Sequence, residues 1–275
     1  MTSNDQQRFA FGENWSRYLA VVDDERIAEA ERSLLEMVGR DAIAGRTWLD
    51  AGSGSGLFSL AALRLGAATL RSFDYDADSV ACTDELRARA GDGAAQRWTV
   101  ERGSVLDEAY MKGLGTFDLV YSWGVLHHTG DLWTAFDHAA AAVAPGGLLF
   151  VAIYNDQGLR SRVWRIIKRW YNVLPERLRL AYTIAIMGPR ELLSLLKNTA
   201  LLRPGRYVRS WTDYRSARGM SRWHDIVDWI GGYPFEVARP ATVTARGQAH
   251  GLVVERLVER RGLGCNEFVF RRPAD

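Results

Sequence analysis

Two adjacent histidines, His127 and His128, follow an apolar segment with the sequence FDLVYSW. A neutral imidazole can take a proton from a hydroxyl group near pH 7. An apolar segment without alternation is typical of a strand buried on both faces. Residues after such a strand lie at the carboxyl edge of a parallel sheet, where ligands bind. Either histidine is therefore a candidate general base, and the alternative is that both shape or support this edge structurally.

A glycine-rich turn occurs earlier, in the segment WLDAGSGSGLF. Gly52, Gly54 and Gly56 follow a short apolar strand that ends at Asp50, and a helical segment comes next. Glycine adopts positive φ angles and lets a ligand approach the backbone, while a helix start offers unpaired N–H groups. The spacing departs from the dinucleotide pattern Gly-x-Gly-x-x-Gly, because Leu57 occupies the position of the third glycine. The turn indicates a loop that approaches a nucleotide.

The elements that would position these residues alternate regularly. Five apolar strand segments alternate with helical segments over the first 155 residues, and Asp23 or Asp24 is a candidate cap for the first helix. This alternation predicts a parallel sheet with right-handed crossovers and helices on both faces. Pro145 to Gly147 predicts a turn before the fifth strand. Residues 252–259 and 266–271 predict a hairpin added to that sheet.

Composition places the chain among globular proteins. It has 275 residues, of which 47% are hydrophobic and 25% are charged. No apolar segment reaches the roughly 18–20 residues of a membrane span, and the N-terminus does not resemble a signal peptide. Cys82 and Cys265 are too few for a disulfide framework or a zinc cluster, so we expect a cytoplasmic protein.

Charge is distributed unevenly along the chain. Residues 160–222 contain fifteen Lys or Arg and three Asp or Glu, although the whole chain has a net charge of only +2. The same segment contains tryptophans and leucines at helical spacing. A lid over the substrate pocket, an oligomer face, an anionic membrane surface and a nucleic-acid surface all fit this composition. We expect a lid or an oligomer face, and no nucleic acid, because the segment contains no known RNA-binding module.

The ordered motifs resemble those of class I S-adenosylmethionine-dependent methyltransferases. The resemblance covers LDAGSGSG, SFDYD, GSVLD, FDLVYSWGVLHH and PGGLLFVAIY in that order. It implies a Rossmann-like, doubly wound α/β fold, with a seven-stranded sheet of order 3-2-1-4-5-7-6 and an antiparallel last strand. We expect an N-terminal lid or helix (1–46), the cofactor-binding core (47–155), the basic helical insertion (156–222) and a C-terminal helix and hairpin (223–275).

The resemblance also implies S-adenosyl-L-methionine as the cofactor. Asp74 would bind the ribose hydroxyls, Tyr75 would stack on the adenine, and Ser104 stands where the family often has Asp. The expected cofactor-binding residues are Asp50, Gly52, Ser53, Gly54, Gly56, Asp74, Tyr75, Ser104, Val105, Ser122 and Trp123.

The acceptor side of the site has candidates from several segments. The expected substrate-contacting residues are Trp15, Tyr18, Tyr154, Asn155 and His224. Tyr154 and Asn155 alternatively cap the fifth strand, His224 alternatively lies on an ordinary helix, and the N-terminal aromatic residues alternatively anchor a packed terminus. We expect no metal, because Ser122 and Trp123 stand where metal-dependent relatives need an acid.

The function predicted from these residues is methyl transfer to a small molecule. The histidines and tyrosines favour a hydroxyl acceptor, and the basic insertion would suit an anionic one. Transfer to nitrogen or carbon remains an alternative, as does a cofactor-binding regulatory subunit without turnover. A homodimer is a further expectation.

Overall fold

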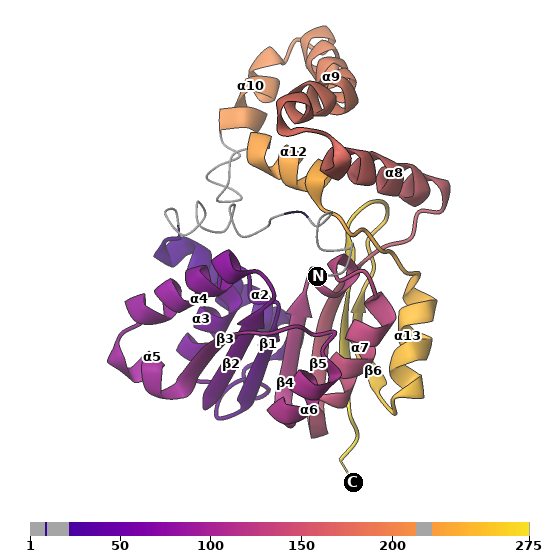
Figure 1. Ribbon diagram of the computed structural model, residues 1–275. Coiled ribbons are helices and arrows are strands. Elements are labelled where there is room, and N and C mark those ends of the chain that lie inside the picture. The colour runs from indigo at the N-terminus through magenta and orange to yellow at the C-terminus, as the bar shows by residue number, and fades with distance from the viewer. Residues whose placement is uncertain (1–8, 10–21, 213–221, 275) are drawn as a thin grey trace.

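The computed structural model describes residue 9, residues 22–212 and residues 222–274. Its centre is one seven-stranded sheet in the order β3-β2-β1-β4-β5-β7-β6 (Figure 1). Strands β1 to β5 pair in parallel, and β7 runs antiparallel to both β5 and β6. The predicted strand order and the antiparallel last strand are confirmed. The strands are β1 (Thr47–Ala51), β2 (Thr69–Asp74), β3 (Trp98–Arg102), β4 (Phe117–Trp123), β5 (Val143–Tyr154), β6 (Val253–Val258) and β7 (Cys265–Arg271).

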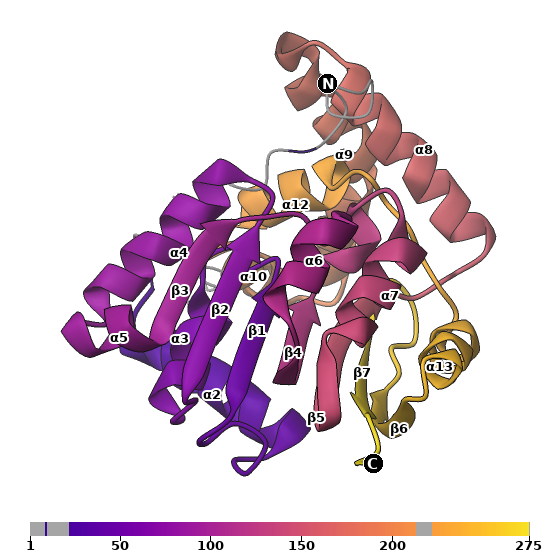
Figure 2. The ribbon, with the colours of Figure 1, turned by 60° about the horizontal axis from the view of Figure 1, so that its bottom comes forward.

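Helices cover both faces of the sheet. Figure 2 shows α6 and α7 in front of the sheet, with α2 and α3 behind it. The alternation of strand residues produces the two cores: Trp48 joins the layer with α2, α3 and α4, whereas Leu49 joins the layer with α6, α7 and α13. The helices of these layers are α2 (Asp24–Val38), α3 (Leu57–Arg64), α4 (Ala77–Arg89), α5 (Asp92–Arg97), α6 (Glu108–Leu114), α7 (Leu132–Ala141) and α13 (Pro240–Ala249).

Helix starts follow their capping residues. The Asp23 carboxylate accepts from the Arg26 backbone N–H, which confirms one of the two predicted caps. Asp76, Asp107 and Asp131 cap α4, α6 and α7 in the same way. These caps fix where each helix begins after its strand, and so fix the loops at the carboxyl edge of the sheet.

The turn predicted at Pro145 to Gly147 is wrong. These residues lie inside β5, where the pairing with β4 shifts between Phe117 and Leu119. Gly147 is needed there because a Cβ atom would lie 2.8 Å from the Asp118 carbonyl oxygen. Proline and glycine therefore mark a bulge rather than the end of pairing.

The basic insertion forms a third packed unit at the carboxyl ends of the strands (Figure 1). Its helices are α8 (Leu159–Val173), α9 (Glu176–Ala200) and α10 (Pro204–Thr212), and α12 (Arg222–Gly231) packs with them. Tyr171, Met187, Ile226 and Ile230 form its buried centre. Arg222 Nη2 donates to both carboxylate oxygens of Glu191, which joins α12 to α9. Among the described helices, none combines the length and the apolar character needed to cross a membrane.

Candidate active site

The glycine turn after β1 has the backbone conformation that only glycine adopts easily. Gly52, Gly54 and Gly56 have φ angles of 88°, 55° and 77°. A Cβ atom on Gly52 would overlap the Val125 side chain, and one on Gly56 would lie 3.0 Å from the Thr83 Cα atom. Two of the three glycines are therefore required by protein packing as well as by the backbone angle.

The turn is attached to the end of β2. The backbone N–H groups of Gly52 and Ser53 donate to the Phe73 carbonyl, at 2.8 and 3.1 Å. The Gly54 N–H donates to Asp74 Oδ2 and the Asp76 N–H to Asp74 Oδ1, both at 3.0 Å. Burial raises the pKa of Asp74, and these two donors act in the opposite direction. The carboxylate therefore has a fixed orientation at the strand end.

Two expected cofactor residues flank this carboxylate. Tyr75 is 39% exposed, and the Arg102 guanidinium lies 5.7 Å from its ring centroid. Ser104 follows β3, and its Oγ atom accepts from the Leu106 N–H at 3.2 Å, so the hydroxyl closes a local turn. Val105 is buried and its carbonyl accepts from His138 Nδ1. The structure thus gathers residues 74–75 and 104–105 beside the glycine turn.

Asp50 lies deeper than its neighbours. Its Oδ2 atom accepts from the Ser59 hydroxyl at 2.6 Å, and Ser59 bonds to Ser72, whose Oγ accepts from Trp98 Nε1. Burial, with a smaller contribution from the charge of Asp74, raises the pKa of Asp50 to about 7. The contacts of Asp50 therefore connect the turn to a buried polar chain under β2 and β3.

The end of β4 is tied to the end of β1. The Ser122 hydroxyl is buried and donates to the Ala51 carbonyl at 2.7 Å. Trp123, the next residue, is 44% exposed. Of these two expected cofactor residues, Ser122 acts within the sheet and only Trp123 presents its side chain to the surface.

The two histidines form a short helix, η2 (Leu126–His128), directly after β4. The Nδ1 atom of His128 lies 2.6 Å from the Pro234 carbonyl oxygen. A carbonyl only accepts, so Nδ1 carries the proton and the lone pair of the neutral ring is on Nε2. This is the tautomer of a general base that is oriented through its other nitrogen.

His127 has a different environment. It is fully buried, and its ring centroid lies 4.0 Å from that of Tyr154 and 4.5 Å from that of His128. Within the described residues, neither ring nitrogen has a partner in hydrogen-bond geometry. Burial holds the pKa of His127 well below its usual value, the positive charges of His128 and Lys168 add to this, and only a weak contact with the Ala152 backbone acts in the opposite direction. His127 is therefore a neutral ring packed in the wall of the site.

An aromatic cluster from distant segments closes over these rings. Tyr154 packs on Phe235 and Trp229, with centroid distances of 5.2 and 5.8 Å. Lys168 of α8 is fully buried, donates from Nζ to the Trp229 carbonyl, and lies 4.3 Å from the Trp229 ring centroid. Trp229, Phe235 and Lys168 were not predicted as site residues. A signal for the lysine existed: Lys168 shares the α8 face of Trp164 and Tyr171, at spacings of four and three.

The remaining predicted substrate residues are not gathered in this cluster. The Asn155 side chain donates to the carbonyls of Arg260 and Gly262 at 2.8 and 3.4 Å, so its contacts are those of a strand-end cap. His224 belongs to α12, but its side chain lies outside the description. Trp15 and Tyr18 also lie outside the described residues.

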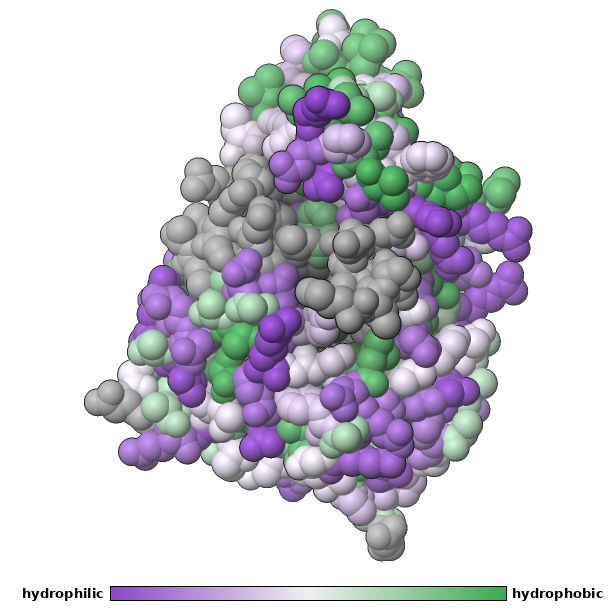
Figure 3. All heavy atoms as spheres, viewed as in Figure 1, coloured by the Kyte–Doolittle hydropathy of each residue, from purple (hydrophilic) through white to green (hydrophobic). Residues whose placement is uncertain are grey.

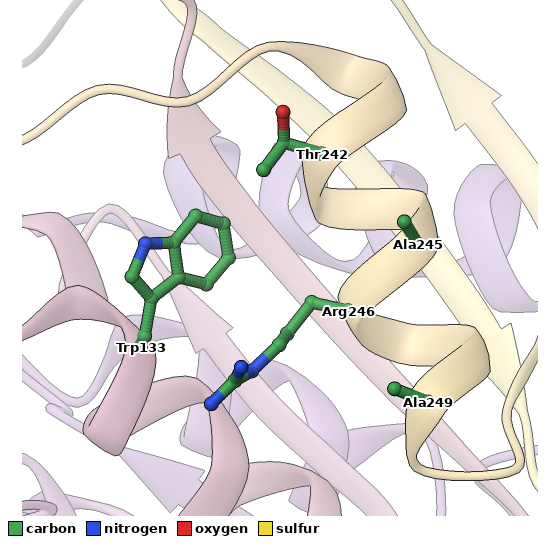
Figure 4. A pocket seen from close by; sticks show the side chains of 5 residues that line it. All are labelled: Trp133, Thr242, Ala245, Arg246 and Ala249. Carbon is green, nitrogen blue, oxygen red and sulfur yellow. The ribbon is translucent and has the colours of Figure 1, made fainter.

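A cavity of about 370 Å³ between α7 and α13 is separate from this site. Trp133 and Arg246 point into it from the two helices (Figure 4). Arg246 is paired with Asp137, which also accepts from His250. The cavity contains none of the candidate cofactor or catalytic residues.

Comparison with known proteins identifies the family. A sequence model described as a methyltransferase domain matches residues 22–218, which is most of the chain. The chain belongs to the methyltransferase domain family. Ubiquinone biosynthesis O-methyltransferases are among its curated relatives: the protein from Parvibaculum lavamentivorans is 31% identical over 138 residues, covering 48% of this chain and 51% of that protein. The chain spans about half the length of the curated relatives it matches.

Solved methyltransferases share the fold of this methyltransferase domain. Magnesium protoporphyrin IX methyltransferase from Synechocystis PCC 6803, with bound SAH, has a TM-score of 0.54 and 14% identity, covering 94% of each chain. An O-methyltransferase family protein from Burkholderia thailandensis also has a TM-score of 0.54, with 16% identity, covering 90% of this chain and 56% of that chain. The class I methyltransferase fold predicted from the sequence is confirmed.

The cofactor of class I methyltransferases is S-adenosyl-L-methionine, and the residues present fit it. The fixed Asp74 carboxylate suits two ribose hydroxyls, and the turn at Gly52–Gly56 exposes no large side chain beside it. Tyr75 offers an aromatic face near the same strand end. The predicted enzyme class and cofactor therefore agree with the family and the site.

Proposed function

We propose that this methyltransferase transfers a methyl group to a hydroxyl of a small-molecule acceptor, with His128 as the general base. The observation that carries the proposal is the hydrogen bond from His128 Nδ1 to the Pro234 carbonyl, which leaves the proton-accepting lone pair on Nε2. The ubiquinone biosynthesis O-methyltransferases among the relatives support an oxygen acceptor.

The cofactor supplies an electrophilic methyl group on a positively charged sulfur. The chain's own residues orient the cofactor and the acceptor, and they deprotonate the acceptor hydroxyl. Asp74 and the glycine turn hold the adenosine end, while Tyr154, Trp229 and Phe235 exclude water from the acceptor side. His128 takes the acceptor proton on Nε2, and the Pro234 carbonyl stabilises the resulting imidazolium through Nδ1–H.

Other elements of the proposal concern the acceptor and the assembly. The basic insertion supports an anionic acceptor, and a homodimer and a cytoplasmic location remain predictions. Transfer to nitrogen or carbon and a regulatory role without turnover are the alternatives. These alternatives can be distinguished by measuring the release of S-adenosylhomocysteine with separate pools of phenols, carboxylates and amines. Binding of the cofactor without turnover in any pool would support the regulatory role.

The variant His128→Asn tests the base directly. An asparagine amide N–H can replace Nδ1–H towards Pro234, but it supplies no group at the position of Nε2. We expect kcat to fall by about 10²- to 10⁴-fold while affinity for S-adenosylhomocysteine is unchanged.

His138→Asn is the matched control, because His138 Nδ1 also lies 2.7 Å from a carbonyl, that of Val105, on the front face of the sheet. Its kcat should match that of the wild type. An undiminished kcat in His128→Asn, with the thermal midpoint also unchanged, would eliminate His128 as the base.

A further inference from the structure

The outer surface of the insertion is the most apolar exposed part of the described residues. Nineteen large apolar side chains are exposed among all the described residues, and fifteen of these lie between Leu159 and Val208. In Figure 3 these apolar residues gather over α9 at the top of the molecule and along α8. Exposed patches of this extent mark interaction surfaces in proteins.

Helix α8 has an apolar stripe on the side turned away from the protein core. The stripe follows spacings of four and three residues, so its members share one helix face. The exposed side chains are Leu159, Val163, Ile166, Trp170 and Val173. Lys168 and Tyr171 are buried on the opposite face. The stripe is therefore additional to the face that holds α8 in the fold.

Helix α9 continues this surface. Leu192, Leu193 and Leu196 are each more than half exposed, and Leu202, just beyond the helix, is 90% exposed. These residues lie on the helix that packs against α10 and α12 through its other side. The apolar surface therefore spreads over two helices and the turn after α9.

The charges around this surface are almost all positive. Apart from the buried Lys168, residues 159–212 contain eleven Lys or Arg, none of them buried, and two Glu. Glu191 is already paired with Arg222, which removes one of the two negative charges. At 100° per residue, Arg162 and Arg169 lie beside the α8 stripe, and both are exposed.

We propose that this surface, formed by the outer faces of α8 and α9, docks on an anionic lipid bilayer. Apolar side chains bordered by arginines match the acyl boundary and the negative headgroups of such a bilayer. A second copy of the chain fits less well, because a symmetric contact would place two strongly positive surfaces against each other. The proposal does not depend on the identity of the methyl acceptor.

The position of the surface gives the docking a geometric consequence. The insertion stands on the carboxyl edge of the sheet, where the aromatic cluster and His128 lie (Figure 1). The inner face of α8 reaches that cluster through Lys168, and the outer face of the same helix carries the stripe. Docking would hold the acceptor side of the site near the bilayer.

Vesicle co-sedimentation of the full-length protein tests the proposal. We expect binding to vesicles of phosphatidylcholine with about 30 mol % phosphatidylglycerol to be at least about tenfold stronger than to pure phosphatidylcholine. Raising the salt concentration to about 0.5 M should weaken that binding, because exposed charges are then screened.

Two variants separate the apolar and the charged contributions. Ile166→Ser with Trp170→Ser, and Arg162→Gln with Arg169→Gln, should each reduce anionic-vesicle binding by about tenfold or more. Val253→Ser is the control, because Val253 is 58% exposed on β6, outside the insertion. All variants should keep the thermal midpoint and the S-adenosylhomocysteine affinity of the wild type, since the substituted side chains are exposed.

Three results would overturn the proposal. The first is equal binding to neutral and anionic vesicles. The second is wild-type vesicle binding by both double variants. The third is a wild-type dimer in sedimentation velocity that Ile166→Ser with Trp170→Ser converts to a monomer, together with no vesicle binding, since this surface would then be an interface between two copies.

Discussion

Replacing Lys168 by methionine should remove a specific pH dependence of stability. Lys168 is fully buried in α8, donates to the Trp229 carbonyl, and lies over the Trp229 and Phe235 rings at 4.3 and 4.9 Å. Burial lowers the pKa of Lys168 from 10.5 to about 7, and the charge of Asp228 acts weakly in the opposite direction. The folded protein therefore binds the lysine proton less tightly than the unfolded chain does.

The size and sign of the effect follow from this difference. One pKa unit corresponds to about 1.4 kcal/mol, so the charged lysine costs the folded state about 5 kcal/mol relative to water. Between pH 7 and pH 10.5 the unfolded chain holds more protons at this site than the folded protein. The free energy of unfolding should therefore rise with pH in that window, by about 1 kcal/mol per pH unit, from Lys168 alone.

Urea unfolding at three pH values between 7.5 and 9.5 measures this effect. Lys168→Met removes the titrating group, although it leaves the Trp229 carbonyl without this donor, at a cost of about 1–3 kcal/mol. The free energy of unfolding of the wild type minus that of the variant should increase by about 2 kcal/mol across the range.

Lys197→Met, on the exposed side of α9, is the control and should run parallel to the wild type. A constant difference between wild type and Lys168→Met across the range would refute the argument from burial.

Three further predictions concern the cofactor turn and the acid range. Gly52→Ala should cost more stability than Gly91→Ala in urea unfolding, because both glycines have a φ of 88° but only Gly52 faces a neighbour, Val125, that a Cβ would overlap; equal losses would show that packing adds nothing. Asp74→Ala should weaken S-adenosylhomocysteine binding by at least about tenfold in calorimetry, since it removes the acceptor that holds the turn; unaltered affinity would remove Asp74 from the site. His127 remains neutral in the folded protein, so the free energy of unfolding should fall as the pH drops below 6.5, because the unfolded chain then takes up a proton that the folded protein does not. In urea titrations between pH 5 and 7, the variant His127→Phe should show a smaller fall than the wild type. An equal fall in both proteins would contradict this prediction.

Much of the fold was predictable because its signals are local. Strand segments such as FDLVYSW are continuous and apolar, and each ends at a glycine or a polar residue, so their order along the chain indicates the sheet. The sequence did not predict helices α5, α6 and α13. The first two have six and seven residues, too few for a periodic apolar pattern, and α13 has ten residues but buries only Val243 and Gly247. At Pro145 to Gly147 a clear local pattern was present but misleading, since residues typical of turns also form bulges within strands.

The candidate site was only partly predictable for a related reason. Asp74 and the glycines could be proposed as cofactor residues because strand ends and turns leave short motifs in the sequence. The sequence did not indicate that the Ser104 and Ser122 hydroxyls form hydrogen bonds with the Leu106 N–H and the Ala51 carbonyl of the protein backbone. The sequence also did not separate the roles of His127 and His128. They differ in burial and in the Pro234 carbonyl that only His128 contacts, and both depend on segments distant in the chain.

By itself the sequence determined the succession of strands and helices along the chain, the glycine turn and the position of the histidine pair after β4, since each depends on residues that are adjacent in the chain. The order of the strands within the sheet came from the family resemblance. Only the tertiary structure decided that Pro234 orients His128 from 106 residues away, and that Lys168 reaches the Trp229 carbonyl from a different helix. It also decided that one face of α8 packs inward while a second apolar face remains exposed. Hydrogen bonds and burial between distant segments depend on how the helices and strands pack, and a local pattern of residue types does not specify that packing.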